Sequence, residues 1–311
     1  MRNQNNSNNK KSLDKALIIM AIITITMALL LIATIVLNNA EIQFLKQNGD
    51  EIKGSYSATE NITWDISENR DGSVVATLSD DGILIISGTG KMKEWSEHDN
   101  TEWHGMKDKV KSVIIEEGVT NIGYTAFYEC SDLISIEISN SVTSIESSAF
   151  EGCTSLTNIK IPNSVTNIGN SVFEKCTSLA SIEISNRVTS IGVDAFYECI
   201  SLTSIIIPNS VTSIDHSAFN GCTSLTSIEI PNSVTSISDA VFGGCTSLTS
   251  IKIPNSVISI GDGVFAECIS LTSIEIDKEN KNYMDDNGVL YRKNRVYIKV
   301  AKKVTKKKKY K

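Results

Sequence analysis

The sequence predicts a β-rich solenoid of the α/β-horseshoe kind, with seven 23-residue repeats, a small β cap before them and one transmembrane helix ahead of both. Three observations predict it: cysteines and phenylalanines recur at a fixed interval, each repeat begins with alternating apolar residues, and one early 22-residue segment carries no charge. A period of 20 to 50 residues is typical of solenoids and repeat arrays. With 41% hydrophobic and 21% charged residues, the composition is that of a folded chain.

The first predicted element is a transmembrane helix over residues 16–37, after an Asn-rich segment, residues 1–15. A helix of 22 residues is about 33 Å long, enough to cross a hydrocarbon core of about 30 Å. The alternative is a cleavable signal peptide, which would release a secreted protein. Signal peptides have shorter apolar cores, about 7 to 15 residues, and Asn38-Asn39-Ala40 is a poor cleavage site. We therefore favour an uncleaved anchor.

The charges that flank this helix predict its orientation. Four basic residues precede it, whereas acidic and basic residues nearly cancel over the linker that follows, residues 38–60. The positive-inside rule then leaves residues 1–15 in the cytoplasm and places the repeats outside the cell. The sequence predicts a single-pass membrane protein with an extracellular repeat domain.

An N-terminal cap is predicted over residues 61–112. Val74–Leu78 and Ile83–Ser87 alternate in polarity around Asp-Asp-Gly, which is typical of a β-hairpin. A solenoid needs such a cap because its terminal coil would otherwise expose an apolar end.

The repeats occupy residues 113–276, and one unit, Ile159–Ser181, shows the pattern. Its Ile-x-Ile start predicts a short strand with both isoleucines pointing inward. Pro162 opens a turn and ends strand pairing. The residues from Val172 to Leu179 predict one helical or 3₁₀ turn on the convex side.

The full pattern, Ile-x-Ile-Pro-x-Ser-Val-Thr-Ser-Ile-Gly-x-x-Ala-Phe-x-x-Cys-x-Ser-Leu-Thr-Ser, resembles the BspA-type (Treponema pallidum-type) leucine-rich repeat of bacterial surface proteins. The segment from Trp64 to Trp103 resembles the N-terminal cap of that family, and residues 277–291 resemble the hairpin that follows such repeats. The resemblance implies a leucine-rich-repeat fold. It also implies an adhesin-like role toward host matrix proteins or neighbouring cells.

Two columns of repeated residues are predicted to fill the interior of the solenoid. They are Phe127, Phe150, Phe173, Phe196, Phe219, Phe242 and Phe265, and Cys130, Cys153, Cys176, Cys199, Cys222, Cys245 and Cys268. Disulfides, a metal site or catalysis are alternatives for the cysteines. Their odd number, their shared apolar position and the absence of a Cys-x-x-Cys pair favour buried free thiols.

Little in the sequence indicates enzymatic or metal chemistry. His98 and His104 lie among acidic residues near the tryptophans of the cap, so a weak metal site is an alternative to a solvated acidic loop, which we favour. His216 has no nucleophile at a useful spacing, and neither a phosphate-binding loop nor a catalytic carboxylate pair is recognisable. We predict no catalytic residue, no cofactor and no metal.

The best candidate for function is the predicted concave face, where the residue between the two isoleucines of each strand points outward. These residues are Glu137, Lys160, Glu183, Ile206, Glu229, Lys252 and Glu275. Concave solenoid faces typically hold extended partners. The face lacks the Tyr, Trp and Arg anchors of binding hot spots, so a polar face that only maintains solubility is the alternative.

Charge divides the chain and limits its partners. Residues 41–291 hold 14 basic and 35 acidic residues, a net charge of −21, whereas residues 292–311 hold 11 basic residues and no acid. The acidic body argues against nucleic-acid binding. The basic, Lys-rich tail is either a solvated, disordered end or a contact for an anionic wall polymer. Extracellular proteins or neighbouring cell surfaces are the predicted partners, and a structural spacer or self-association module is the alternative function.

Overall fold

The computed structural model describes residues 61–95, 101–286 and 289–292. They belong to one compact unit, Thr59–Lys311. Within these ranges no helix is long and apolar enough to cross a membrane. The predicted span 16–37 lies outside the described residues, as do its flanks and the basic tail beyond Arg292.

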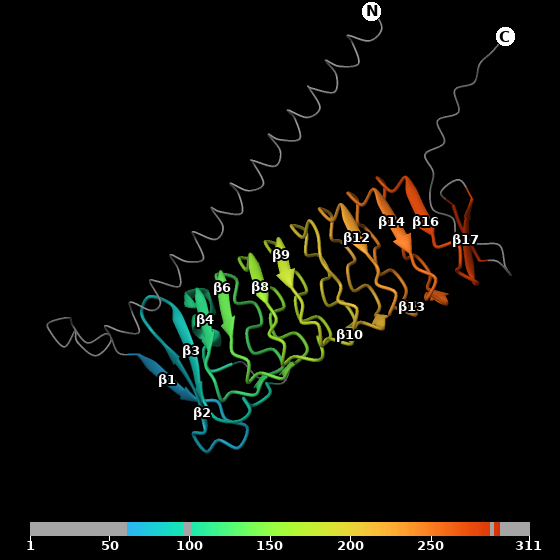
Figure 1. The fold of residues 1–311 in the computed structure, drawn as a ribbon. Helices are drawn as coiled ribbons and strands as arrows, with labels where there is room; N and C mark the ends of the chain where they lie inside the picture. Colours follow the sequence, from blue (N-terminus) through green and yellow to red (C-terminus); the bar gives the residue numbers. More distant parts are fainter. Residues whose placement is uncertain (1–60, 96–100, 287–288, 293–311) are drawn as a thin grey trace, which may run out of the picture. The chain divides into compact units, whose positions relative to one another are not determined.

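A small β cap begins the described chain (Figure 1). Its strands are β1 (Ile62–Asp65), β2 (Val74–Leu78) and β3 (Ile83–Gly88). β2 and β3 pair antiparallel from Val74↔Gly88 to Leu78↔Leu84, which confirms the predicted hairpin. Gly82 ends the connecting turn at a φ of +88°, a conformation that glycine adopts without strain. β3 then pairs in parallel with the first strand of the repeats, so the cap extends the same sheet.

The Ile-x-Ile segments form parallel strands that lie side by side along one face (Figure 1). These strands are β4 (Ser112–Ile115), β6 (Ser135–Ile138), β8 (Asn158–Lys160), β9 (Ser181–Glu183), β12 (Ser227–Glu229), β14 (Ser250–Ile253) and β16 (Ser273–Ile276). Pairs such as Ser250↔Ser273 keep the 23-residue register. The fifth repeat has no strand at this position, only an isolated bridge from Ile206 to Glu229. The predicted solenoid is confirmed.

A second row of two-residue strands forms at the Ser-Ile or Asn-Ile of every repeat but the third, where Ile168 makes only isolated bridges to Ile145 and Ile191. They are β5 (Asn121–Ile122), β7 (Ser144–Ile145), β10 (Ser190–Ile191), β11 (Ser213–Ile214), β13 (Ser236–Ile237) and β15 (Ser259–Ile260). β10, β11, β13 and β15 form one parallel sheet, while β5 and β7 form another. The repeat is therefore held to its neighbours on two sides by backbone hydrogen bonds.

On the third side the described repeats contain single i→i+3 turns, such as the Cys176 N–H bonded to the Phe173 carbonyl at 3.1 Å, and no continuous helical segment. Other backbone N–H groups of this side donate to the next repeat. In one repeat, the Ser171 N–H donates to the Val193 carbonyl (2.8 Å). In the same way the Phe173 N–H donates to the Ala195 carbonyl (2.9 Å) and the Lys175 N–H to the Tyr197 carbonyl (2.7 Å). Ser171 and Lys175 have φ angles of 53° and 57°, which turn their N–H groups along the stack. Bonds to the next repeat thus alternate along the chain with i→i+3 bonds inside the turn. The one 3₁₀ helix among the described residues, η1 (His104–Lys109), lies before the first repeat.

The interior holds the phenylalanines and the cysteines in two columns. All fourteen side chains are buried. Neighbouring phenyl rings have centroids 5.2 to 6.0 Å apart and planes within 16° of parallel. Trp103 of the cap stacks on Phe127 at 5.8 Å, so an aromatic ring covers the N-terminal end of the phenylalanine column.

An incomplete eighth repeat closes the other end. Asn280 and Tyr283 stand 23 residues after Val257 and Ile260, where an eighth repeat would place Val and Ile. The Asn280 amide donates to the carbonyls of Pro254 (2.8 Å) and Val257 (3.0 Å), and the Tyr283 hydroxyl accepts from the Ile260 N–H (2.8 Å). The hairpin of β17 (Tyr283–Asp286) and β18 (Val289–Arg292) follows. Polar side chains thus satisfy backbone groups that a further repeat would otherwise bond.

Candidate binding surface

The seven outward residues of the Ile-x-Ile segments all lie exposed on one surface, which we call the strand face. Register places Lys160 opposite Glu183, and Glu229 opposite Lys252. Ile206 is the one uncharged member, and its side chain is 85% exposed. The Ile206 side chain is therefore accessible from outside the chain.

The strand face is interrupted between β6 and β8. Within the described chain neither a ladder nor an isolated bridge joins these two strands. At the preceding junction, between β4 and β6, the Ser139 N–H donates to the Ile115 carbonyl at 3.2 Å. At the last junction, between β14 and β16, the Asp277 N–H donates to the Ile253 carbonyl at 2.9 Å. Pro162 occupies the equivalent position after β8 and has no N–H to donate.

Proline stands at this position in four repeats, Pro162, Pro208, Pro231 and Pro254. The junctions that lead into the repeats of Pro162 and Pro208 have no strand pairing on this face. The junction into the repeat of Pro231 keeps a single bridge, and the junction into the repeat of Pro254 keeps three residue pairs. In none of these repeats does pairing on this face extend to the proline, as predicted, but only the first two junctions lack pairing altogether. The same proline is therefore found at open junctions and at a paired one.

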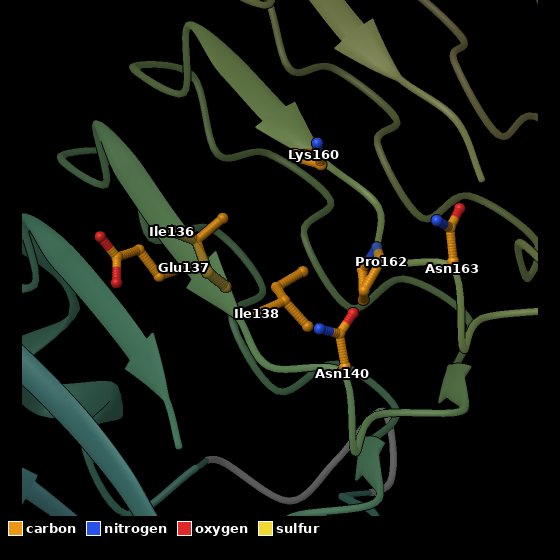
Figure 2. A pocket seen from close by; sticks show the side chains of 7 residues that line it. All are labelled: Ile136, Glu137, Ile138, Asn140, Lys160, Pro162 and Asn163. Atoms are coloured by element: carbon orange, nitrogen blue, oxygen red, sulfur yellow. The ribbon is translucent and has the colours of Figure 1, made fainter. Parts of the chain in front are cut away.

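A cavity of about 300 Å³ lies beside the β6–β8 break. Its lining residues come from both sides of the break (Figure 2): Ile136, Glu137, Ile138 and Asn140 from the first, and Lys160, Pro162 and Asn163 from the second. Ile136 and Ile138 are only partly buried, whereas the matching isoleucines of the following repeats are buried. The cavity therefore combines an apolar surface with two amides and two opposite charges, at the small end of the range for ligand pockets.

The charges around this cavity are not evenly paired. Lys160 Nζ lies 3.1 Å from Glu183 Oε1, and both side chains are about 70% exposed, so the pair contributes little stability. Glu137 has no ion-pair partner among the described residues, and Figure 2 shows its carboxylate pointing away from Lys160. A carboxylate at the cavity rim is therefore free to meet a cation.

The cysteine column supports neither nucleophilic nor metal chemistry in its native state. The seven thiols are free and buried, and burial raises the pKa of Cys130 and of Cys222 to about 12. A thiol nucleophile needs the thiolate form, which such pKa values suppress. Six of the thiols, from Cys153 on, donate to the carbonyl of the phenylalanine 26 residues earlier, as Cys176 does to Phe150 at 3.1 Å.

The histidines do not assemble a site in the described structure. His104 begins η1, while His98 lies outside the described residues. His216 Nδ1 is 3.8 Å from Asp239 Oδ2, and both side chains are more than half exposed. Among the described residues no group of three His, Cys, Asp or Glu side chains is placed to hold a metal ion.

The repeat region matches the family described as the BspA type leucine-rich repeat region, in six copies, over residues 105–226 and 213–310. The chain belongs to the BspA-type leucine-rich repeat family. Leucine-rich-repeat proteins generally mediate protein interactions and are typically non-enzymatic scaffolds. No curated protein sequence matches this BspA-type chain.

Solved structures of bacterial leucine-rich repeat proteins are similar to this chain. A leucine-rich repeat protein of T. pallidum is 30% identical, with a TM-score of 0.50, over 65% of this chain and 89% of that one. A leucine-rich cell surface protein from Faecalibacterium prausnitzii is 26% identical over 70% of this chain and 77% of that one, with a TM-score of 0.40. A leucine-rich repeat protein from Bacteroides ovatus is 24% identical over 72% of this chain and 71% of that one, with a TM-score of 0.46.

Two features of this BspA-type solenoid were not predicted from the sequence. The first is the cavity, with Ile136, Ile138, Asn140 and Asn163. The alternation of Ser139, Pro162 and Ser185 at one repeat position could have indicated it. The second is the left-handed backbone of non-glycine residues such as Ser171. Its position holds Thr, Ser, Asp, Ala and Gly in different repeats, so composition gives no indication of it.

Proposed function

We propose that this protein is a membrane-anchored cell-surface scaffold that binds other proteins noncovalently through its strand face. The observation that carries the proposal is the split in that face beside β6, where a cavity with partly exposed isoleucines adjoins the row of outward residues. Partly exposed apolar side chains inside a polar rim are typical of protein-binding patches. Membership of the leucine-rich-repeat class supports the same function.

The anchor and the location are part of this proposal. Residues 16–37 would cross the membrane, and the positive flank before them would keep the N-terminus in the cytoplasm. The repeats would then face extracellular proteins or neighbouring cells, in an adhesin-like role. Many anchored copies would add avidity to weak single contacts.

Capture of partners by the full-length protein in detergent micelles tests the binding function. We expect selected extracellular proteins to be retained, and retention to fall at least fivefold when Glu137, Glu183 and Glu229 are all changed to lysine. The matched control is Glu267→Lys, which reverses an exposed charge on the turn side of the last repeat. Equal loss in the control, or capture that none of the strand-face changes affects, would refute the proposal. Self-association alone would favour the spacer function.

Protease treatment of intact cells tests the location separately. If the repeats are extracellular, the protease removes them while a cytoplasmic marker survives. Repeats that stay protected until the cells are opened would contradict the proposed orientation.

A further inference from the structure

The strand face carries two apolar contact points among charged residues. One is the cavity beside β6, whose surface includes Ile136, Ile138 and Pro162. The other is Ile206, 85% exposed on a segment that is bridged only to Glu229. Because neighbouring repeats place a charge at the Ile206 position, the two points stand out from the rest of the face.

Their separation follows from the geometry of the stack. Strands lie about 4.8 Å apart, and the cavity lies between the rows of Glu137 and Lys160. Ile206 stands two rows beyond Lys160, so the two points are about two and a half rows, or roughly 12 Å, apart. An extended peptide advances about 3.3 Å per residue and points alternate side chains to opposite faces. Two side chains on one face that match this distance are four residues apart.

The charge of the strand face sets a further requirement for the partner peptide. Glu137 lines the cavity, and its carboxylate, directed away from Lys160 (Figure 2), has no ion-pair partner in the described structure, while Lys160 pairs with Glu183. The stretch of residues 41–291 has a net charge of −21, so its field attracts cations toward the face. A lysine or arginine next to the cavity-bound side chain would pair with Glu137.

We propose that the strand face binds an extended peptide segment of a partner protein with large apolar side chains at positions i and i+4 and a basic residue beside the first. The first apolar side chain occupies the β6–β8 cavity, and the second packs on Ile206. The amides of Asn140 and Asn163, both at the cavity, are available for the main chain of the peptide. This inference rests on the proposed protein-binding function and specifies the partner sequence that the face would select.

Two dye-labelled peptides of identical composition test the spacing. Lys-Leu-Thr-Ser-Thr-Leu-Lys has its leucines four residues apart, and Lys-Leu-Thr-Ser-Leu-Thr-Lys has them three apart. Fluorescence anisotropy with the purified full-length protein in detergent micelles measures both affinities. We expect the first peptide to bind about tenfold more tightly, the effect of one additional apolar contact.

Three variants of the protein test where the peptide makes its contacts. Ile206→Ser, at an exposed position that cannot disturb folding, should abolish the difference between the peptides. Glu137→Gln should weaken both peptides and reduce the dependence of binding on salt concentration. Pro162→Ser supplies the missing N–H, so pairing of β6 with β8 should close the cavity and weaken both peptides. Glu267→Gln, at an exposed carboxylate on the turn side of the last repeat, is the control and should change nothing.

Each outcome decides a separate point. Equal affinities of the two peptides, or an unchanged difference in Ile206→Ser, would overturn the inferred spacing. Capture of extracellular proteins that still depends on the strand face would then leave the binding function standing with another partner chemistry. If capture of extracellular proteins did not depend on the strand face either, both the proposed binding function and the inferred partner sequence would be refuted.

Discussion

Each cysteine from Cys153 to Cys268 combines burial with a sulfur hydrogen bond to the preceding repeat. The thiol of Cys199, for example, donates to the Phe173 carbonyl at 3.1 Å. Alanine at this position would leave a cavity, and valine would remove the donor. The column therefore links neighbouring repeats with a side chain small enough to repeat every 23 residues.

Thiol labelling checks this arrangement. With a pKa of about 12, a thiol such as Cys222 is only about one part in ten thousand thiolate at pH 8. We expect less than one thiol per native chain to react with a maleimide within an hour, and all seven to react in urea. Cys268 should react first, because it is 6% exposed and its pKa is raised only to about 11. Rapid native labelling of Cys199 would contradict the burial.

For single residues, the sequence predicts where a side chain lies better than which hydrogen bonds it makes. The 23-residue period places Phe196 and Cys199 in apolar columns, because a repeated inward residue has to stack on its copies. The direction of a thiol hydrogen bond depends on how the Phe173 carbonyl is oriented. That orientation follows from left-handed residues such as Ser171, which the composition of their column does not indicate.

Among the elements, the strands and the cap depend on single side chains at junctions. Tyr283 supplies the acceptor that the Ile260 N–H would find in another repeat, at 2.8 Å. Ser139 and Pro162 differ by one backbone donor, and β6 is paired on the first side and open on the other. Short strands are sensitive to such changes because each has few hydrogen bonds.

Replacing Tyr283 with phenylalanine should destabilise the C-terminal cap. The partly buried Ile260 N–H would lose its acceptor, at a cost of about 1 to 3 kcal/mol in the free energy of unfolding. Urea unfolding followed by circular dichroism measures the loss. Tyr128→Phe, at a side chain that is 38% exposed, is the control and should change stability by less than about 0.5 kcal/mol. Equal effects would argue against a capping role for the Tyr283 hydroxyl.

Pro162→Ser should convert the β6–β8 break into a paired junction. Hydrogen exchange of the amides in residues 136–138 and 158–160 should slow, because the strands would bond to each other. The stability should change by less than about 1 kcal/mol, since the added hydrogen bond is offset by greater freedom of the unfolded chain. Unchanged exchange would show that the proline is not the cause of the break.

For the molecule as a whole, stability is a sum over neighbouring repeats. The ring of Phe196 stacks between two others, at 5.4 and 5.2 Å, whereas Phe265 stacks on one at 6.0 Å. A substitution in the middle therefore removes contacts on both sides of a repeat. At the end it removes them on one side only.

Alanine at Phe196 should cost about 3 to 5 kcal/mol and separate the unfolding of the two halves. Phe265→Ala should cost less and leave one transition. Urea unfolding with hydrogen exchange at both halves distinguishes these results. Similar losses in the two variants would mean that the column does not act through nearest neighbours.

The solenoid itself could be predicted from the sequence, since period, strand pattern and core columns agree on it. The break in the strand face could not, because a missing N–H opens one junction and leaves three pairs at another, β12–β14. The outcome depends on how the neighbouring coils pack.

Because every junction repeats the same register, a gene could gain or lose one 69-nucleotide unit and still encode a solenoid with both caps intact, about 4.8 Å longer or shorter. Recombination between near-identical coding stretches would thus adjust how far the molecule reaches. Any such event between the codons of Glu137 and Ile206 would also reset the distance between the cavity and the exposed isoleucine.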